Sequence, residues 1–162
     1  MKRLLTVFAF VCFSLAVTAQ GKLPNVTLKD LNGKSVNIAQ YGQSDKPVII
    51  SFWATWCGPC LKELEAINKV YDKWKSETGV ELVAGSIDAS RTRARVKPLV
   101  NGKSWDYTIL LDENQALKRP MNVVNPPYTI IVHKGKIVYA HSGYTPGAEN
   151  DLYKELKKPV GK

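Results

Sequence analysis

Cysteine is scarce in this chain of 162 residues, which contains only Cys12, Cys57 and Cys60. A framework of structural disulfides needs more cysteines than this, and a structural zinc site needs about four ligands. No second cysteine pair accompanies Cys57 and Cys60, and there are only two histidines. The count therefore argues against a disulfide-stapled scaffold and against a structural zinc site.

Acidic residues are also few: 14 aspartates and glutamates oppose 23 lysines and arginines, which gives a formal net charge of +9. A basic surface allows binding to acidic partners or to membrane head groups. Nothing in the sequence resembles a nucleic-acid-binding module, so we interpret the excess as a solvated basic surface and expect no nucleic-acid partner. With 44% hydrophobic residues, the chain can form one compact domain with a core of its own.

No apolar run reaches the roughly 20 residues that a membrane-spanning helix needs. The apolar stretch 4–17 follows the basic pair Lys2-Arg3 and precedes a small-residue cleavage site that ends at Ala19. We therefore predict a signal peptide over residues 1–19 and a single domain over residues 20–162, with an uncleaved membrane anchor as the alternative.

Removing this signal would also remove Cys12 and leave Cys57 and Cys60 as the only cysteines of the exported chain. The chain would lose two basic residues and no acids, which leaves a net charge of +7. Lipid modification of Cys12 is the alternative, but Val11 stands where a lipoprotein signal usually has a small residue. An exported protein with one close cysteine pair is not built as a disulfide scaffold, which favours a redox role.

The cysteine pair stands between a predicted strand and a predicted helix. Residues 48–53 form a short apolar run typical of a buried strand, and apolar residues then recur at helical spacing from Leu61 to Trp74. Cys57 and Cys60 therefore lie in the first turn of the helix, on one face. There the helix dipole and free N–H groups stabilise a thiolate, chiefly at Cys57, and lower the pKa of such a cysteine from about 8.5 to ~3.5–7.5.

This placement predicts thiol–disulfide exchange, in which Cys57 attacks and Cys60 resolves the mixed disulfide. The alternatives are a structural disulfide and half of a zinc site. A structural bridge rarely spans so short a loop, because it would remove little entropy from the unfolded chain. Zinc binding lacks the further ligands, so the redox interpretation is favoured.

The run FWATWCGPC, between an apolar strand and an amphipathic helix, resembles the thioredoxin superfamily. Together with Glu63 in the helix and the signal-like start, it is similar to the exported branch of that superfamily, the TlpA/ResA-like thiol–disulfide oxidoreductases. The resemblance extends over most of the chain after about residue 24. It implies an α/β, thioredoxin-like fold with a central mixed β-sheet flanked by helices, extended by an N-terminal β-hairpin.

The remaining segments can be placed in this fold. Strands are expected over 26–28, 36–38, 80–87, 107–111, 128–133 and 137–141, the first two joined by a turn at Asn32-Gly33. Helices are expected from the cysteines to near Gly79, over 113–119 with Asp112 as the cap, and within 146–158. Glu65 stands where relatives often carry a kinking proline, so we expect a straighter helix.

By the resemblance, Pro127 is the cis-proline that thioredoxin-fold proteins place opposite the cysteines and beside the bound substrate. Pro126 precedes it, so the backbone N–H that relatives use to pair with substrate is missing and only the carbonyl remains. The alternative is a simple Pro-Pro entry into a strand. Trp56, next to Cys57, has an apolar face suited to a substrate peptide, or else belongs only to the hydrophobic rim of the fold.

Two acidic residues are candidates for acid/base chemistry. Thioredoxin carries a buried aspartate six residues before the first cysteine, thought to assist proton transfer from the resolving thiol, and Ser51 occupies that position here. The role can pass to water, to Asp88 at the carboxyl end of a strand, or to Glu63 on the cysteine helix. The alternatives are that Asp88 caps a helix and that Glu63 is solvated.

One segment, 90–103, is notably basic and contains Arg91, Arg93, Arg95 and Lys97. A charge run of this kind is usually a solvated face, which is our interpretation. Since the exported branch carries an insert about here, binding of a partner is the alternative.

We therefore expect a monomeric thiol–disulfide oxidoreductase of the bacterial periplasm or cell envelope, with the redox-active disulfide Cys57–Cys60 and no metal or other cofactor. The resemblance implies that it reduces disulfides in exported proteins such as apocytochrome c, as part of cytochrome c maturation, and that a membrane thiol reductase supplies the electrons. The rival function is a copper- or other metal-binding chaperone that uses both cysteines and a histidine. His133 and His141 flank a predicted hairpin turn and are expected to lie near one another. A binding module without redox activity is a third hypothesis.

Overall fold

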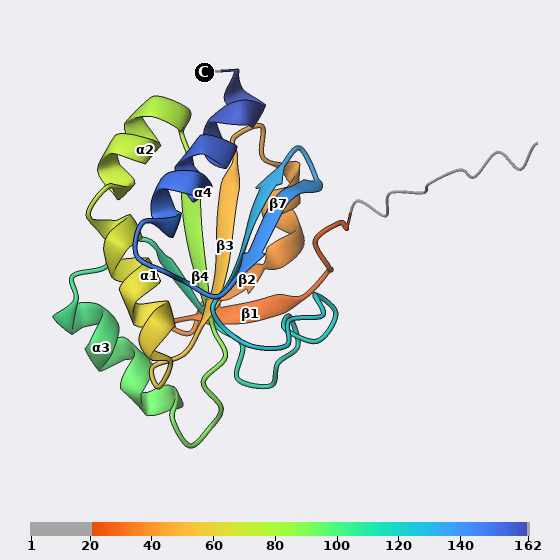
Figure 1. The fold of residues 1–162 in the computed structure, drawn as a ribbon. Helices are drawn as coiled ribbons and strands as arrows, with labels where there is room; N and C mark the ends of the chain where they lie inside the picture. Colours follow the sequence, from red (N-terminus) through yellow and green to blue (C-terminus); the bar gives the residue numbers. More distant parts are fainter. Residues whose placement is uncertain (1–20, 162) are drawn as a thin grey trace, which may run out of the picture.

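The computed structural model describes residues 21–161, so the predicted signal at 1–19 lies outside the described residues. One mixed sheet of seven strands has the order β2-β1-β5-β4-β3-β6-β7 (Figure 1). The strands are β1 (Thr27–Asp30), β2 (Ser35–Asn37), β3 (Val48–Trp53), β4 (Glu81–Ser86), β5 (Thr108–Leu111), β6 (Tyr128–His133) and β7 (Lys136–Ser142).

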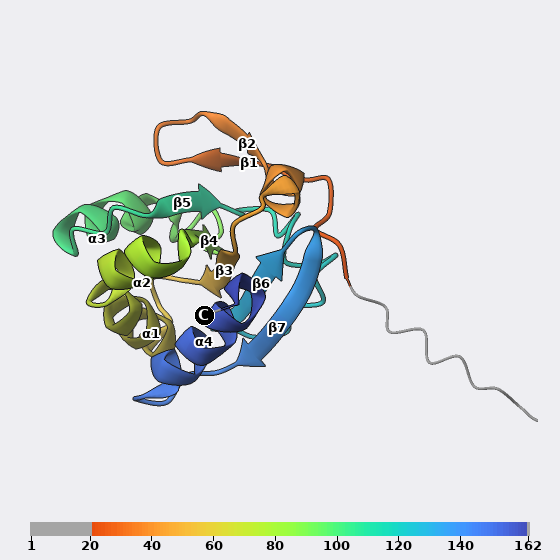
Figure 2. The ribbon, with the colours of Figure 1, turned by 90° about the horizontal axis from the view of Figure 1, so that it is seen from above.

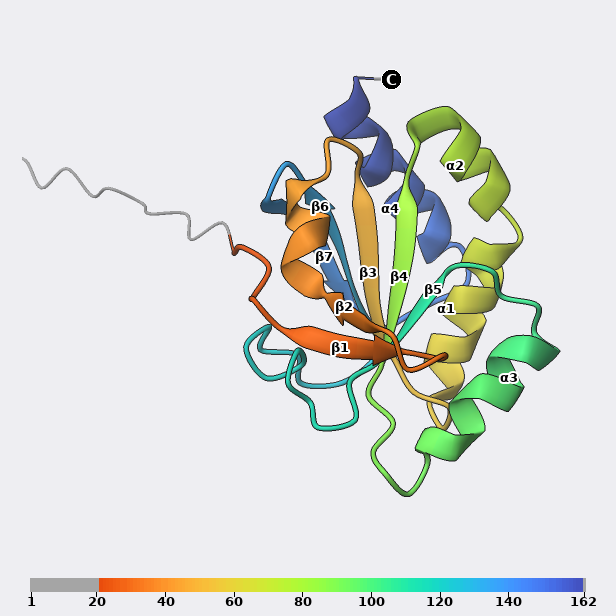
Figure 3. The ribbon, with the colours of Figure 1, turned by 180° about the vertical axis from the view of Figure 1, so that it is seen from behind.

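The helices lie mainly on one side of this sheet. They are α1 (Gly58–Asn68), α2 (Tyr71–Thr78), α3 (Val96–Gly102) and α4 (Ala148–Lys157), with the 3₁₀ helices η1 (Ile38–Gln43), η2 (Arg93–Arg95) and η3 (Lys158–Val160). Figures 1 and 3 view the molecule from opposite sides, and α1, α2 and α4 lie in front of the strands in the first and behind them in the second. Figure 2 shows the short helix η1 on the other side of the sheet. Within residues 21–161, no helix is both long and apolar enough to cross a membrane.

Strand β3 is the centre of the sheet. It pairs in parallel with β4, as expected for two strands joined by helices, and antiparallel with β6. All six of its residues are buried, which explains why it reads as a continuous apolar run. The carboxyl ends of β3 and β4 therefore meet at one edge of the sheet, where the cysteine motif begins.

The predicted N-terminal hairpin is confirmed. The side chain of Asp30 accepts the backbone N–H groups of Asn32 and Lys34, and Gly33 adopts φ +84°, a left-handed conformation that costs glycine little. Strand β1 then pairs antiparallel with β5. The hairpin thus extends the mixed sheet at one edge, as the resemblance implied.

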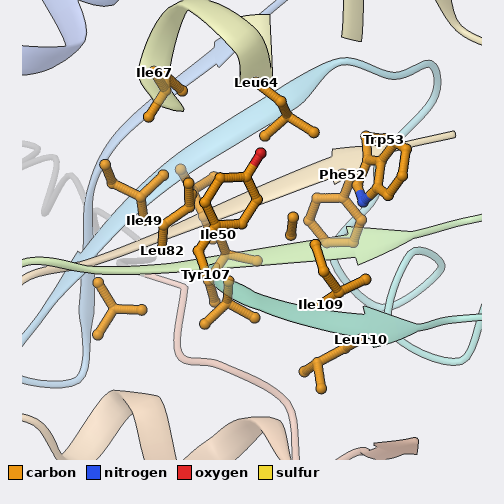
Figure 4. Close-up of a cluster of buried hydrophobic side chains, with 14 of the residues drawn as sticks. Ile49, Ile50, Phe52, Trp53, Leu64, Ile67, Leu82, Tyr107, Ile109 and Leu110 are labelled. Atoms are coloured by element: carbon orange, nitrogen blue, oxygen red, sulfur yellow. The ribbon is translucent and has the colours of Figure 1, made fainter. Parts of the chain in front are cut away.

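The core lies between the sheet and its helices. Figure 4 shows Leu64 and Ile67 of α1 on the side of the sheet to which Ile49 and Trp53 of β3 point. All four of these side chains are fully buried. Burial of each stabilises the fold by roughly 1.5–3 kcal/mol, so α1, which carries the cysteines, is firmly attached to the sheet.

The prediction of one straight helix from the cysteines to Gly79 is wrong. The helix stops at Asn68, and α2 begins only at Tyr71. Between them Val70 leaves the helical region, with φ −120° and ψ 0°, and its N–H donates to the carbonyl of Ile67 only three residues back. The predicted end is correct, because Gly79 follows α2 as a left-handed C-cap with φ +69°.

The predicted helix over 113–119 is also wrong, because this segment forms a series of turns. Gln115 adopts φ +56°, which no α-helix contains. The Asp112 carboxylate accepts the N–H groups of Leu117 at 3.0 Å and Lys118 at 2.8 Å, five and six residues onward. Asp112 therefore closes a loop instead of capping a helix.

Candidate active site

Cys57 is the N-cap of α1, and Cys60 lies inside the first turn. The Cys57 sulfur accepts the backbone N–H of Cys60 at 3.3 Å, and the two cysteines form a disulfide with a Cα–Cα distance of 5.3 Å. Cys57 is 6% exposed, whereas Cys60 is completely buried. Only Cys57 can therefore meet a substrate from outside, which agrees with the predicted roles of attack for Cys57 and resolution for Cys60.

The loop that leads to Cys57 is held by Asp88. Asp88 is 1% exposed, and its carboxylate accepts both the backbone N–H of Thr55 at 2.8 Å and the Thr55 hydroxyl at 2.6 Å. The hydroxyl of Ser86 donates to the same carboxylate at 2.9 Å. Asp88 follows β4 at the predicted edge of the sheet, but its side chain fixes the cysteine loop and caps no helix.

Glu63 is buried as well, so the interpretation of a solvated side chain is wrong. It is 1% exposed and lies one helical turn after Cys60. Its Oε2 accepts the hydroxyls of Thr129 at 3.0 Å and Ser51 at 3.3 Å, and its Oε1 lies 2.7 Å from Nε2 of His141. At the position of the thioredoxin aspartate this chain has Ser51, whose hydroxyl donates a hydrogen bond to Glu63 of the helix.

The three partners of Glu63 form a row across the sheet. Ser51 of β3 is paired with Thr129 of β6, and Thr129 is paired with His141 of β7. Sequence reasoning missed this row, although Ser51 and Thr129 are polar residues in strands that are otherwise apolar, and buried hydroxyls usually have a partner. That their partner is Glu63 depends on this register and on where α1 packs on the sheet.

The two histidines are far apart along the β6–β7 hairpin, which contradicts the expectation that they are neighbours. His133 is paired with Lys136 beside the turn, whereas His141 is paired with Thr129 at the other end. Burial lowers the pKa of His133 below its ordinary value. Over the described part of the chain, no three His, Cys, Asp or Glu side chains are grouped so that they could hold a metal ion.

The peptide bond between Pro126 and Pro127 is cis, as the resemblance implied. Pro127 is buried, and its carbonyl accepts the N–H of Gly143 at 2.8 Å. Pro126 is half-buried and lines a surface cavity together with Trp56. The substrate-binding roles of Trp56, Pro126 and Pro127 stay predictions.

This cavity has a volume of about 510 Å³ and lies beside the cysteine motif. Two of its lining side chains are large and apolar yet exposed, Trp56 at 56% and Val124 at 79%. Arg91 and Lys118 also line it, and none of the described lining residues is acidic. Of the basic segment, Arg91 thus faces the cavity, whereas Arg93 forms an ion pair elsewhere, with Glu113.

Comparison with known proteins agrees with this geometry. The Redoxin family model matches residues 18–156. The thiol-disulfide oxidoreductase ResA of Bacillus thuringiensis subsp. konkukian is 32% identical over 83% of this chain and 75% of that relative.

Solved structures show the same fold. The solution structure of a thioredoxin-like protein from Porphyromonas gingivalis is 49% identical, covers 86% of this chain and 92% of its own, and superposes with a TM-score of 0.75. StoA from Bacillus subtilis covers 81% and 99% with a TM-score of 0.63, and at 22% identity its likeness concerns the fold alone. The predicted thioredoxin-like fold is therefore confirmed.

Proposed function

The chain belongs to the Redoxin family as a ResA-like thiol–disulfide oxidoreductase acting on thiol-bearing proteins, and we propose that it reduces disulfides in exported proteins of the bacterial cell envelope. The observation that carries this proposal is the pair formed by a slightly exposed Cys57 at the start of α1 and a buried Cys60. The signal-like residues 1–19 support export. Apocytochrome c is the substrate suggested by the resemblance to the exported branch.

In the proposed cycle, the Cys57 thiolate attacks one sulfur of a substrate disulfide. The substrate S–S bond breaks, one substrate thiolate leaves and takes up a proton, and a mixed disulfide remains on Cys57. Cys60 then loses its proton and attacks the Cys57 sulfur, which releases the second substrate thiolate. Two electrons have passed to the substrate, and the Cys57–Cys60 disulfide has formed. A membrane thiol reductase restores the dithiol.

We assign proton acceptance from Cys60 to Glu63. The two residues lie one turn apart on the buried face of α1, and the Glu63 carboxylate is buried in a place that hydroxyl donors already prepare for a negative charge. The Asp88 carboxylate, by contrast, accepts hydrogen bonds from Thr55 and Ser86 and holds the loop in place.

The substrate chain is proposed to lie across Trp56 and the Pro126–Pro127 bond, with its neighbouring residues in the 510 Å³ cavity. The apolar surfaces of Trp56 and Val124 would cover an apolar substrate residue. Arg91 and Lys118 would attract an acidic one, because opposite charges lower the energy of the complex.

The experiment that tests the function combines two cysteine variants with a redox titration. Cys57→Ser should abolish turnover of a disulfide-bearing substrate, and Cys60→Ser should accumulate the mixed disulfide, visible on a non-reducing gel. Full activity of either variant would show that the mechanism is wrong. The reduction potential of the wild-type pair gives the direction: a value near about −270 mV fits a reductant, and one near about −120 mV fits an oxidant and would contradict the proposal.

A further inference from the structure

We propose that His141 is a positioning residue for the resolving step: its Nε2–H holds the Glu63 carboxylate in the orientation in which it acts as the base for the Cys60 thiol. The proposal extends the role of Glu63 in the proposed function and rests on it. His141 lies in β7, 78 residues from Glu63, and the contact exists only because β7 is paired with β6 in this register.

Glu63 is surrounded by hydrogen-bond donors. A carboxylate that is 1% exposed is costly to ionise unless hydrogen-bond donors replace the lost water. Ser51 and Thr129 direct their hydroxyls to Oε2 and not to Oε1, and the two hydroxyl oxygens lie 3.0 Å apart. Among the described residues, Oε1 has one partner, Nε2 of His141 at 2.7 Å, so His141 completes the set of donors.

The surroundings of the His141 imidazole determine which of its nitrogens carries the proton. Nδ1 of His141 is buried and has no hydrogen-bond partner within the described residues. A ring that carries its proton on Nδ1, or on both nitrogens, would leave a buried N–H donor unpaired, which is rarer and costlier than an unpaired acceptor. The network therefore assigns the neutral tautomer with the proton on Nε2, aimed at an ionised Glu63.

Two further titratable side chains, Tyr139 and Tyr144, lie near His141. The Tyr139 ring lies 5.6 Å from the His141 ring, and Tyr144 follows β7. Burial raises the pKa of both tyrosines, and the negative charges of Glu155 and Glu63 raise that of Tyr139 further. Both tyrosines therefore stay neutral at the pH where thiols react, and neither places a charge beside the contact between His141 and Glu63.

The expected effect follows from the loss of this donor. Without Nε2–H, Oε1 of the buried carboxylate has no partner among the described residues, and the carboxylate is free to turn away from Cys60. Fewer molecules then hold the base in position, and resolution by Cys60 slows. The attack by Cys57 does not use Glu63 and should keep its rate.

The experiment follows the two steps separately in the reduced full-length protein. With 4,4′-dithiodipyridine as the disulfide, attack by Cys57 releases one thiopyridone and resolution by Cys60 releases a second, and stopped-flow absorbance records both over a range of pH. In His141→Leu the second release should slow roughly ten- to a hundredfold near neutral pH and recover at higher pH, the size expected for one hydrogen bond to a charged group. In His141→Gln, whose amide N–H can replace Nε2–H, it should stay near the wild-type rate.

His133→Leu is the matched control, because it removes the other histidine of the same hairpin at the far end from Glu63. It should leave both releases unchanged. A wild-type pH profile for the second release in His141→Leu overturns the proposal, and so does a His141→Gln variant as slow as His141→Leu. A wild-type protein that releases no second thiopyridone would contradict the proposed function itself.

Discussion

Among single residues, the two buried carboxylates next to the cysteine motif differ in what they bind. Asp88 accepts the backbone N–H and the hydroxyl of Thr55, so its bonds determine the path of the chain into Cys57. Glu63 binds only side chains, those of Ser51, Thr129 and His141. The first arrangement stabilises a loop, and the second places a carboxylate one helical turn from Cys60.

The role of Asp88 predicts a loss of stability on its removal. Asp88→Ala leaves the Thr55 N–H and the Ser86 hydroxyl without their acceptor, which should lower the free energy of unfolding by roughly 2–3 kcal/mol. Urea unfolding of the oxidised protein measures the change. Asp106→Ala, at an exposed position, is the control and should lie within about 0.5 kcal/mol of wild type. Equal midpoints for the two variants would contradict the anchoring role.

At the scale of elements, the strands and turns that local side-chain patterns specify could be predicted from the sequence. Strand β3 reads as a buried run because both of its faces are covered, and the β6–β7 hairpin is marked by Lys134-Gly135, both with positive φ. The segment 113–119 was mispredicted because Asp112 and the apolar Leu117 imitate a capped helix, while the carboxylate in fact binds N–H groups farther along the chain.

The part of the site that depends on local motifs could also be predicted from the sequence. Cys57 and Cys60 follow from a local motif, and the cis bond before Pro127 follows from the resemblance. The contact between His141 and Glu63 depends on two strand pairings and one helix placement, each of which a shift of one residue would undo. A single sequence does not contain that register in any local pattern.

The end of α2 gives a prediction about backbone conformation. Gly79 has φ +69°, so Gly79→Ala should cost about 1 kcal/mol of stability, because a residue with a Cβ is strained in the left-handed region. The nearest atoms to the added Cβ belong to the flexible Lys46 side chain, so the cost is mainly in the backbone. Thermal unfolding measures it.

Gly102→Ala is the matched control, since this glycine ends α3 and an added Cβ meets nothing within 4 Å. It should be neutral or slightly stabilising, because alanine loses less entropy on folding. A Gly79→Ala variant as stable as the Gly102→Ala variant would show that the C-cap conformation carries no cost.

At the scale of the whole molecule, the excess of basic residues extends to the cavity beside the cysteine motif, which Arg91 and Lys118 line. We expect the double variant Arg91→Glu/Lys118→Glu to have a several-fold lower kcat/KM than wild type for one kind of substrate. This substrate is a peptide disulfide that carries a glutamate beside its cysteine. The effect should weaken in high salt, because the charges are screened. Values of kcat/KM at two salt concentrations measure it.

The control for net charge is Arg95→Glu/Lys136→Glu, which makes the same charge change at exposed positions that do not line the cavity. A matching peptide with lysine in place of glutamate should be favoured, not disfavoured, by the cavity variant. If both double variants lower kcat/KM for the acidic peptide equally, the overall charge of the protein, and not the cavity, determines the preference for this peptide.

The N-terminal hairpin also determines how the sheet ends. Because β1 pairs with β5, the free edge on that side passes to β2, which is only three residues long. On the opposite side, the Ile137 N–H of β7 is already bonded to the Gly21 carbonyl, and a register irregularity interrupts the pairing of β7 with β6. Short or interrupted edges are poor templates for another strand. Both edges of the described sheet are therefore poor sites for pairing with a strand of another chain.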